Sequence, residues 1–170
     1  MTTNFLRYAG ASSNSGLLTS LLTLLTTELE SVANAGTGIS SVNGSSGLFT
    51  NANTGQAIWG ELYFGVGNPA FTAVVGGSLS GWWLTSPDGG TTFEYETTGG
   101  SGVTPGRPPD WYIPGPGAVA VPTGSVLKSG VVRIPALPFK VYFQNNMGNT
   151  LGSGGTTVPY LKLATCADQY

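Results

Sequence analysis

The chain has 170 residues and a net charge of −2, with six Lys and Arg, eight Asp and Glu, 27 glycines and no histidine. Histidine is the side chain that titrates nearest neutral pH and the commonest metal ligand, so its absence argues against acid–base catalysis and metal binding. Six scattered basic residues are too few to bind a nucleic-acid backbone, and no apolar run is long enough to span a membrane.

The N-terminal third is predicted to contain one helix and one connector. Residues 17–33 carry leucines at three- and four-residue spacing, which is typical of an amphipathic helix that packs within the domain or against a neighbouring subunit. Residues 36–54 are mostly Gly, Ser, Thr and Asn and predict a connector or surface arm. We therefore divide the chain into an arm, helix and connector over residues 1–54 and a β-domain over residues 55–170.

The β-domain is predicted from short segments in which apolar residues alternate with polar ones. Residues 58–66 and a second run from Trp82 precede a turn at residues 86–90 and a returning strand at 91–97. Further strands are expected at residues 118–121, 126–134, 139–143 and 158–164, with Pro135 and Pro138 at a bend between two sheets. About eight short strands favour a mainly β fold, an antiparallel β-sandwich or jelly roll with one N-terminal α-helix.

The long segment over residues 98–117 is rich in Gly and Pro and predicts a loop. It carries Trp111 and Tyr112, while Trp59, Trp82 and Trp83 lie in the predicted strands. Adjacent Trp82 and Trp83 must point to opposite faces of a strand, so one is expected in the core and the other partly exposed. Five aromatic residues are therefore candidates for an oligomer interface or for a platform that stacks on sugars: Trp59, Trp82, Trp83, Trp111 and Tyr112.

Other candidate chemistry is weak. Glu94 and Glu96 share one face of a predicted strand, but a solvated pair lacks the raised pKa that a glycosidase acid requires. Asp88 precedes two glycines without further carboxylates at calcium-ligand spacing, so a turn is favoured. Cys166 is the single cysteine and has no histidine to activate it. We expect no enzymatic activity, no metal and no cofactor.

The charges are sorted along the chain. Six acidic residues and no basic one lie from Glu28 to Glu96, whereas five basic residues and a single acid lie from Arg107 to Lys162. This order permits either pairing between strands of one domain or head-to-tail attraction between copies.

Four stretches carry a resemblance to a known group of proteins: Gln56 to Glu61 (QAIWGE), Gly81 to Glu94 (GWWLTSPDGGTTFE), Pro108 to Trp111 (PPDW) and Ile134 to Lys140 (IPALPFK). They resemble small virion structural proteins of tailed bacteriophages. The resemblance implies a jelly-roll protein that decorates or cements the capsid, with the major capsid protein and copies of itself as partners. We expect synthesis in the bacterial cytoplasm, without a signal peptide, and a final location on the capsid surface. The alternative is a carbohydrate-binding module of a phage tail or head fibre, with Trp83 and Trp111 as stacking residues.

Overall fold

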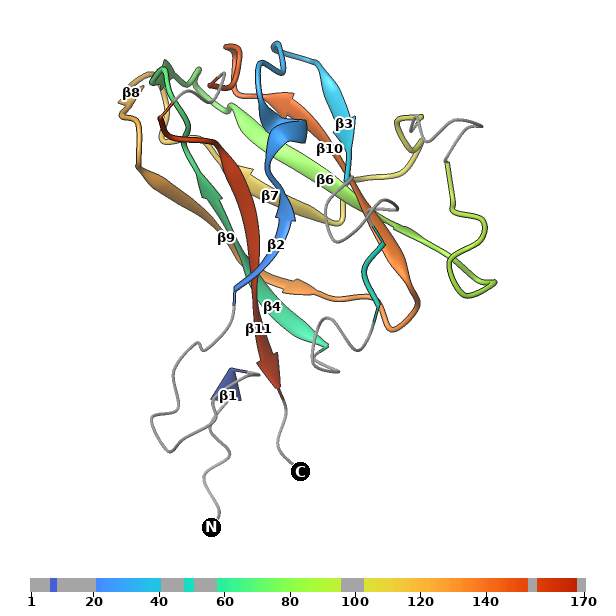
Figure 1. The fold of residues 1–170 in the computed structure, drawn as a ribbon. Coiled ribbons are helices and arrows are strands. Elements are labelled where there is room, and N and C mark those ends of the chain that lie inside the picture. The colour runs from blue at the N-terminus through green and yellow to red at the C-terminus, as the bar shows by residue number, and fades with distance from the viewer. Residues whose placement is uncertain are drawn as a thin grey trace.

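The structure is a computed structural model that describes residues 7–8, 21–40, 48–50, 58–95, 103–152 and 156–167. It is mainly β, and every strand pair in it is antiparallel. Its helical content in this part of the chain is one short 3-10 turn, η1 (Thr27–Leu29). Two main sheets, seen in Figure 1, contain almost all of the strands.

The first sheet has β11 in its interior. Its path runs β1-β11-β4-β9, and β2 also pairs with β11, on the side away from β4. The strands are β1 (Arg7–Tyr8), β2 (Leu21–Leu25), β4 (Trp59–Gly65), β9 (Val126–Arg133) and β11 (Tyr160–Ala167).

The second sheet has the order β3-β10-β6-β7. Its long central pair joins Phe139 to Thr85 at one end and Asn146 to Ser78 at the other. Two further strands, β5 and β8, form a small separate ladder. The strands concerned are β3 (Thr37–Ile39), β6 (Ser78–Thr85), β7 (Trp111–Pro114), β10 (Phe139–Asn146), β5 (Phe71–Thr72) and β8 (Ala120–Val121).

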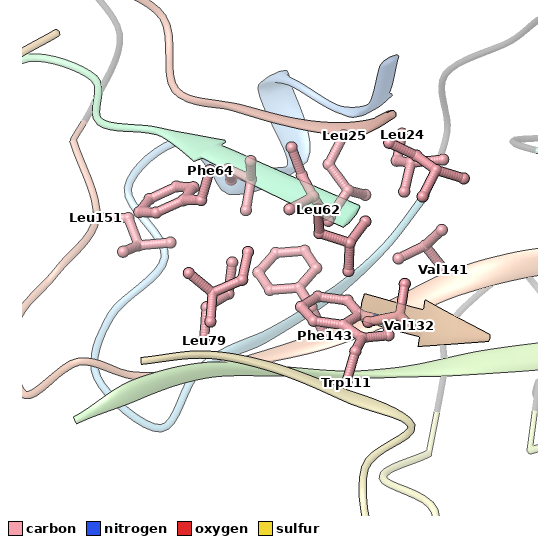
Figure 2. Packing of buried hydrophobic residues seen from close by; sticks show 14 of the residues in the cluster. Leu24, Leu25, Leu62, Phe64, Leu79, Trp111, Val132, Val141, Phe143 and Leu151 are labelled. Carbon is pink, nitrogen blue, oxygen red and sulfur yellow. The ribbon is translucent and has the colours of Figure 1, made fainter. Parts of the chain in front are cut away.

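The core lies between the two main sheets, because alternate residues of each sheet point towards the other. Figure 2 shows Leu62 and Phe64 of β4 facing Leu79 of β6 and Phe143 of β10. Burial of such side chains contributes about 1.5–3 kcal/mol each relative to exposure. The fully buried members with large side chains include Leu24, Leu25, Leu29, Phe49, Leu62, Phe64, Leu79, Trp111, Phe139 and Phe143.

The expected bend at Pro135 and Pro138 is confirmed, since it connects β9 of the first sheet to β10 of the second. The strands predicted at residues 58–66, 126–134, 139–143 and 158–164 are present, with boundaries that differ by at most three residues. Strong alternation identifies these segments because one face of each packs on the core.

The helix predicted over residues 17–33 is wrong in its described part, and residues 17–20 lie outside the described residues. Residues 21–25 form β2, which pairs with β11 through a register that shifts between Leu161 and Lys162. The shift allows neighbouring Leu24 and Leu25 both to be fully buried. Threonines disfavour a helix here because their β-branched side chains lose rotamer freedom in one.

The connector predicted over residues 36–54 contains β3 and an isolated bridge between Phe49 and Phe139, while residues 41–47 and 51–54 lie outside the described residues. Strands β2 and β3 from the first 54 residues thus hydrogen-bond into the two main sheets. Asn145 of β10 holds this segment, because its buried Nδ2 donates to the carbonyls of Val32 and Ala33.

The strand predicted at residues 91–97 is also wrong in its described part, residues 91–95. The carboxylate of Asp88 accepts hydrogen bonds from the backbone N–H groups of Thr91 and Thr92. These two donors are therefore not available for hydrogen bonds to a neighbouring strand. Tyr95 has a left-handed backbone, with φ of 56°. The strand beside β6 is instead β7, which lies inside the segment predicted as a loop.

Candidate functional site

Three of the five predicted aromatic residues are buried. Trp83 and Trp111 lie in the core between the sheets, with ring centroids 6.0 Å apart. Trp82 points to the other face of β6, as the alternation predicts, but it is only 3 % exposed. The expectation of one exposed tryptophan in this pair is therefore wrong, and Trp82, Trp83 and Trp111 cannot form a surface platform.

The burial of Trp82 results from a loop that covers the outer face of the second sheet. Its indole N–H donates to the carbonyl of Arg107, and its ring packs against Tyr142 of β10. Tyr142 in turn hydrogen-bonds through its hydroxyl to Thr104. Phe93 packs on the same small cluster. The part of this outer face around Trp82 and Tyr142 is thus covered by the chain itself.

The other two aromatic candidates, Trp59 and Tyr112, are exposed, at 39 % and 50 %. Tyr112 lies on β7 in the second sheet, while Trp59 begins β4 in the first. The five residues therefore do not meet at one site. Trp59 is the one that lies on a broad exposed sheet surface.

The strand register shows which side chains lie next to one another on the outer face of the first sheet. Arg133 pairs with Trp59, Val131 with Glu61, and Lys128 with Tyr63, which has Lys162 on its other side. We define the basic face as Trp59, Glu61, Tyr63, Lys128, Val131, Arg133 and Lys162. Val131 is 65 % exposed, so this face presents apolar as well as charged groups.

Charge on the basic face is largely uncompensated. It holds three of the six Lys and Arg residues of a chain whose net charge is −2. Its carboxylate, Glu61, accepts a hydrogen bond from the Tyr63 hydroxyl, and the ammonium of Lys162 lies 4.6 Å from the ring centre of Tyr160. The ion pairs found among the described residues both involve Arg107, which lies elsewhere. Such a face is suited to contact an acidic protein surface.

Arg107 instead links two parts of the connection between β6 and β7 to the end of β6. Its guanidinium donates to Asp110 and to the carbonyl of Trp83, and lies 3.6 Å from Glu94. Burial alone would lower the pKa of Arg107, but the hydrogen bond and charge of Asp110 and the charge of Glu94 raise it above its ordinary value. Arg107 therefore stays charged and acts as a structural tie.

The glutamate pair is not brought together as a catalytic site in the described residues. Glu94 accepts a hydrogen bond from Thr85 and pairs with Arg107, while Glu96 lies outside the described residues. Asp88 accepts bonds from Ser86 and Thr92 within its own turn, as expected of a turn residue. No metal-binding group of His, Cys, Asp and Glu occurs in the described residues, and none of their helices could cross a membrane.

Sequence reasoning did not single out Lys128, Arg133 and Lys162. The signal that could have identified them was the period-two pattern of β9 and β11 combined with the excess of basic residues in the second half of the chain. Comparisons with protein-family models, with curated proteins and with solved structures found no match to this chain.

Proposed function

We propose that the chain is a non-enzymatic bacteriophage virion protein that decorates or cements the capsid, and that the basic face contacts the major capsid protein. The observation that carries the proposal is the difference between the two outer faces. Loops cover the outer face of the second sheet around Trp82 and Tyr142, whereas the first sheet presents Arg133 beside Trp59, and Lys128 and Lys162 beside Tyr63. The sequence resemblance to phage virion proteins supplies the identity of the partner.

We also propose that the two sheets form a β-sandwich of jelly-roll type. The eight main strands alternate between sheets along the chain as β2, β3, β4, β6, β7, β9, β10 and β11, with β6 and β7 as neighbours in one sheet. The resulting strand orders, β2-β11-β4-β9 in one sheet and β3-β10-β6-β7 in the other, support a jelly-roll connectivity. Jelly rolls of two four-stranded sheets occur in viral capsid and lectin domains.

Binding through this face would combine weak contacts in many copies. An exposed ion pair contributes about 0.2–1 kcal/mol, so the cations would act mainly on orientation and association rate. Tryptophan is among the residue types that most often contribute a large part of the binding free energy at a protein interface, so Trp59 is expected to contribute more than the cations. Repetition over a symmetric shell then converts modest affinities into stable attachment.

The first experiment is a charge reversal with a matched control. Lys128→Glu changes the basic face, whereas Lys140→Glu makes the same change on β10 of the second sheet. Loss of one attraction and gain of a similar repulsion should cost about 0.4–2 kcal/mol per site, which weakens the Kd by about 2- to 30-fold. Binding to heads stripped of the protein is measured at several salt concentrations, with thermal melts to verify folding.

The proposal predicts a large loss for Lys128→Glu, little change for Lys140→Glu, and a shallower salt dependence for the first variant. Equal effects of the two variants would reject the basic face as the contact surface. A gel of purified particles tests the function itself, because a decoration protein is present in many symmetry-related copies and a fibre component in few. Absence from purified heads would reject the decoration function.

The alternative of a carbohydrate-binding module on a fibre loses the two residues on which it depended. Trp83 and Trp111 are 4 % and 1 % exposed, so neither ring face is open to a sugar. Any saccharide site must therefore depend on contacts other than stacking on these two rings.

A further inference from the structure

A pocket of about 400 Å³ lies where the ends of the two sheets meet the connection between β6 and β7, which Arg107 holds in place. Its wall combines the end of β6, the loops before β7, the start of β4 and the segment that leaves β9. Cavities of about 300–1,000 Å³ with apolar walls and a few convergent polar groups are the usual form of a small-molecule site. The residues that line it are Ile58, Trp83, Thr85, Glu94, Arg107, Asp110, Arg133, Ile134, Pro135 and Ala136.

The polar part of the wall has equal numbers of donors and acceptors of charge-assisted hydrogen bonds. Glu94 and Asp110 are acceptors, and both are already near Arg107. Arg133 has no ion-pair partner among the described residues, so its guanidinium retains free N–H groups. The two carboxylates and two guanidinium groups leave the lining without net charge.

Trp83 contributes to the same wall, with its indole N–H buried as completely as that of Trp111, which does not line the pocket. Trp83 is 4 % exposed, and its indole N–H is buried without a hydrogen-bond acceptor among the described residues. An unsatisfied buried donor costs about 1–3 kcal/mol and is uncommon in folded proteins. Ile58, Ile134 and Pro135 form the apolar side of the pocket.

We propose that this pocket binds one or two residues of a neutral saccharide. A sugar hydroxyl donates and accepts at once, so it can pair with a carboxylate and a guanidinium in the same lining. The C–H groups of the sugar ring can pack on the apolar side. A free anion fits less well because Glu94 and Asp110 would repel it, and a cation fits less well because of Arg133. The proposal does not depend on the capsid contact.

The test blocks the pocket without changing its charge. Ala136 is exposed and lines the pocket, so Ala136→Phe places a ring in its opening. Leu137→Phe is the matched control because Leu137 is the next residue, is 48 % exposed and does not line the pocket. Purified protein is applied to a glycan array, and the free sugars of any bound glycan are titrated by NMR while the indole N–H signals are followed.

We expect the natural protein to bind array glycans and one indole N–H signal to shift on titration. Ala136→Phe should weaken binding by about tenfold or more, and Leu137→Phe by less than about twofold. Glu94→Gln, which retains an acceptor for Thr85, should weaken binding without unfolding the protein. An empty array, equal binding by both phenylalanine variants, or stronger binding of acetate or inorganic phosphate than of any sugar would overturn the proposal.

Discussion

Replacement of Gly81 by alanine should destabilise the protein strongly, although alanine is normally the better residue in a strand. Gly81 lies in the middle of β6, between Phe143 of β10 and Trp111 of β7. A Cβ atom at this position would overlap the indole ring of Trp111. That ring cannot turn aside, because it is 1 % exposed and packs on Trp83.

The expected cost follows from two opposed terms. Removal of glycine from a strand gains about 0.5–1 kcal/mol from the unfolded chain. Forcing a methyl group into a packed core costs about 1–3 kcal/mol, and displacement of β7 would also weaken the hydrogen bond from the Asp110 N–H to the Gly81 carbonyl. We expect a net loss of about 1–3 kcal/mol, or a fall in Tm of roughly 2–12 °C for a chain of this size.

Urea denaturation of four proteins measures this effect: the natural chain, Gly81→Ala, Trp111→Leu and the double variant. In the double variant the obstructing ring is gone, so the two losses should fall short of additivity by at least about 1 kcal/mol. Gly130→Ala is the control, because Gly130 lies in β9 with open space around its Cβ position. Additive losses, or a stabilising Gly81→Ala, would refute the packing of Trp111 on β6.

Two further substitutions test buried and exposed hydrogen bonds. Asn145→Leu should cost about 3–5 kcal/mol in urea denaturation, because the side chain is fully buried and its loss leaves several backbone groups unpaired; a loss below about 1 kcal/mol would contradict this role. The backbone N–H of Thr92, with further hydrogen bonds in the turn, lowers the pKa of Asp88 well below its ordinary value of 3.8. The contribution of the charged form to stability is therefore complete above about pH 3.8 and lost as the pH falls through the lowered pKa. The stability difference between the natural chain and Asp88→Asn should thus be larger at pH 7 than at pH 2, and a difference independent of pH would contradict this.

The strands that sequence reasoning located are those with one face on the core and regular alternation. β4 and β10 satisfy both conditions, and their positions follow from the pattern of Leu62, Phe64, Val141 and Phe143 alone. The leucines of residues 21–29 do not distinguish helix from strand, because three- and four-residue spacing also arises when a strand contains a register shift and ends in a 3-10 turn. Pairing with the free edge of β11 determines the conformation of residues 21–25. That edge is formed by residues 160–167, so the local sequence around residues 21–25 cannot predict it.

The candidate site was harder to predict than the fold for a related reason. The sequence identifies Trp82 as a large aromatic residue that points away from the core, but its exposure depends on whether another segment covers it. The carbonyl of Arg107, 25 residues away, completes that cover through a hydrogen bond. Conversely, Lys128 and Lys162 become neighbours of Tyr63 only when β9 and β11 flank β4.

The position of β11 in the first sheet has a consequence for biosynthesis. Residues 160–167 are made after every other strand of that sheet, yet they occupy the place between β2 and β4. Among the described residues β11 is the strand that pairs with β2, so on the ribosome β2 remains without this partner until more than a hundred further residues have been made. Such distant pairing slows folding and exposes apolar segments meanwhile. The chain should accordingly gain protease resistance in one late step, after residues 160–167 have left the ribosome.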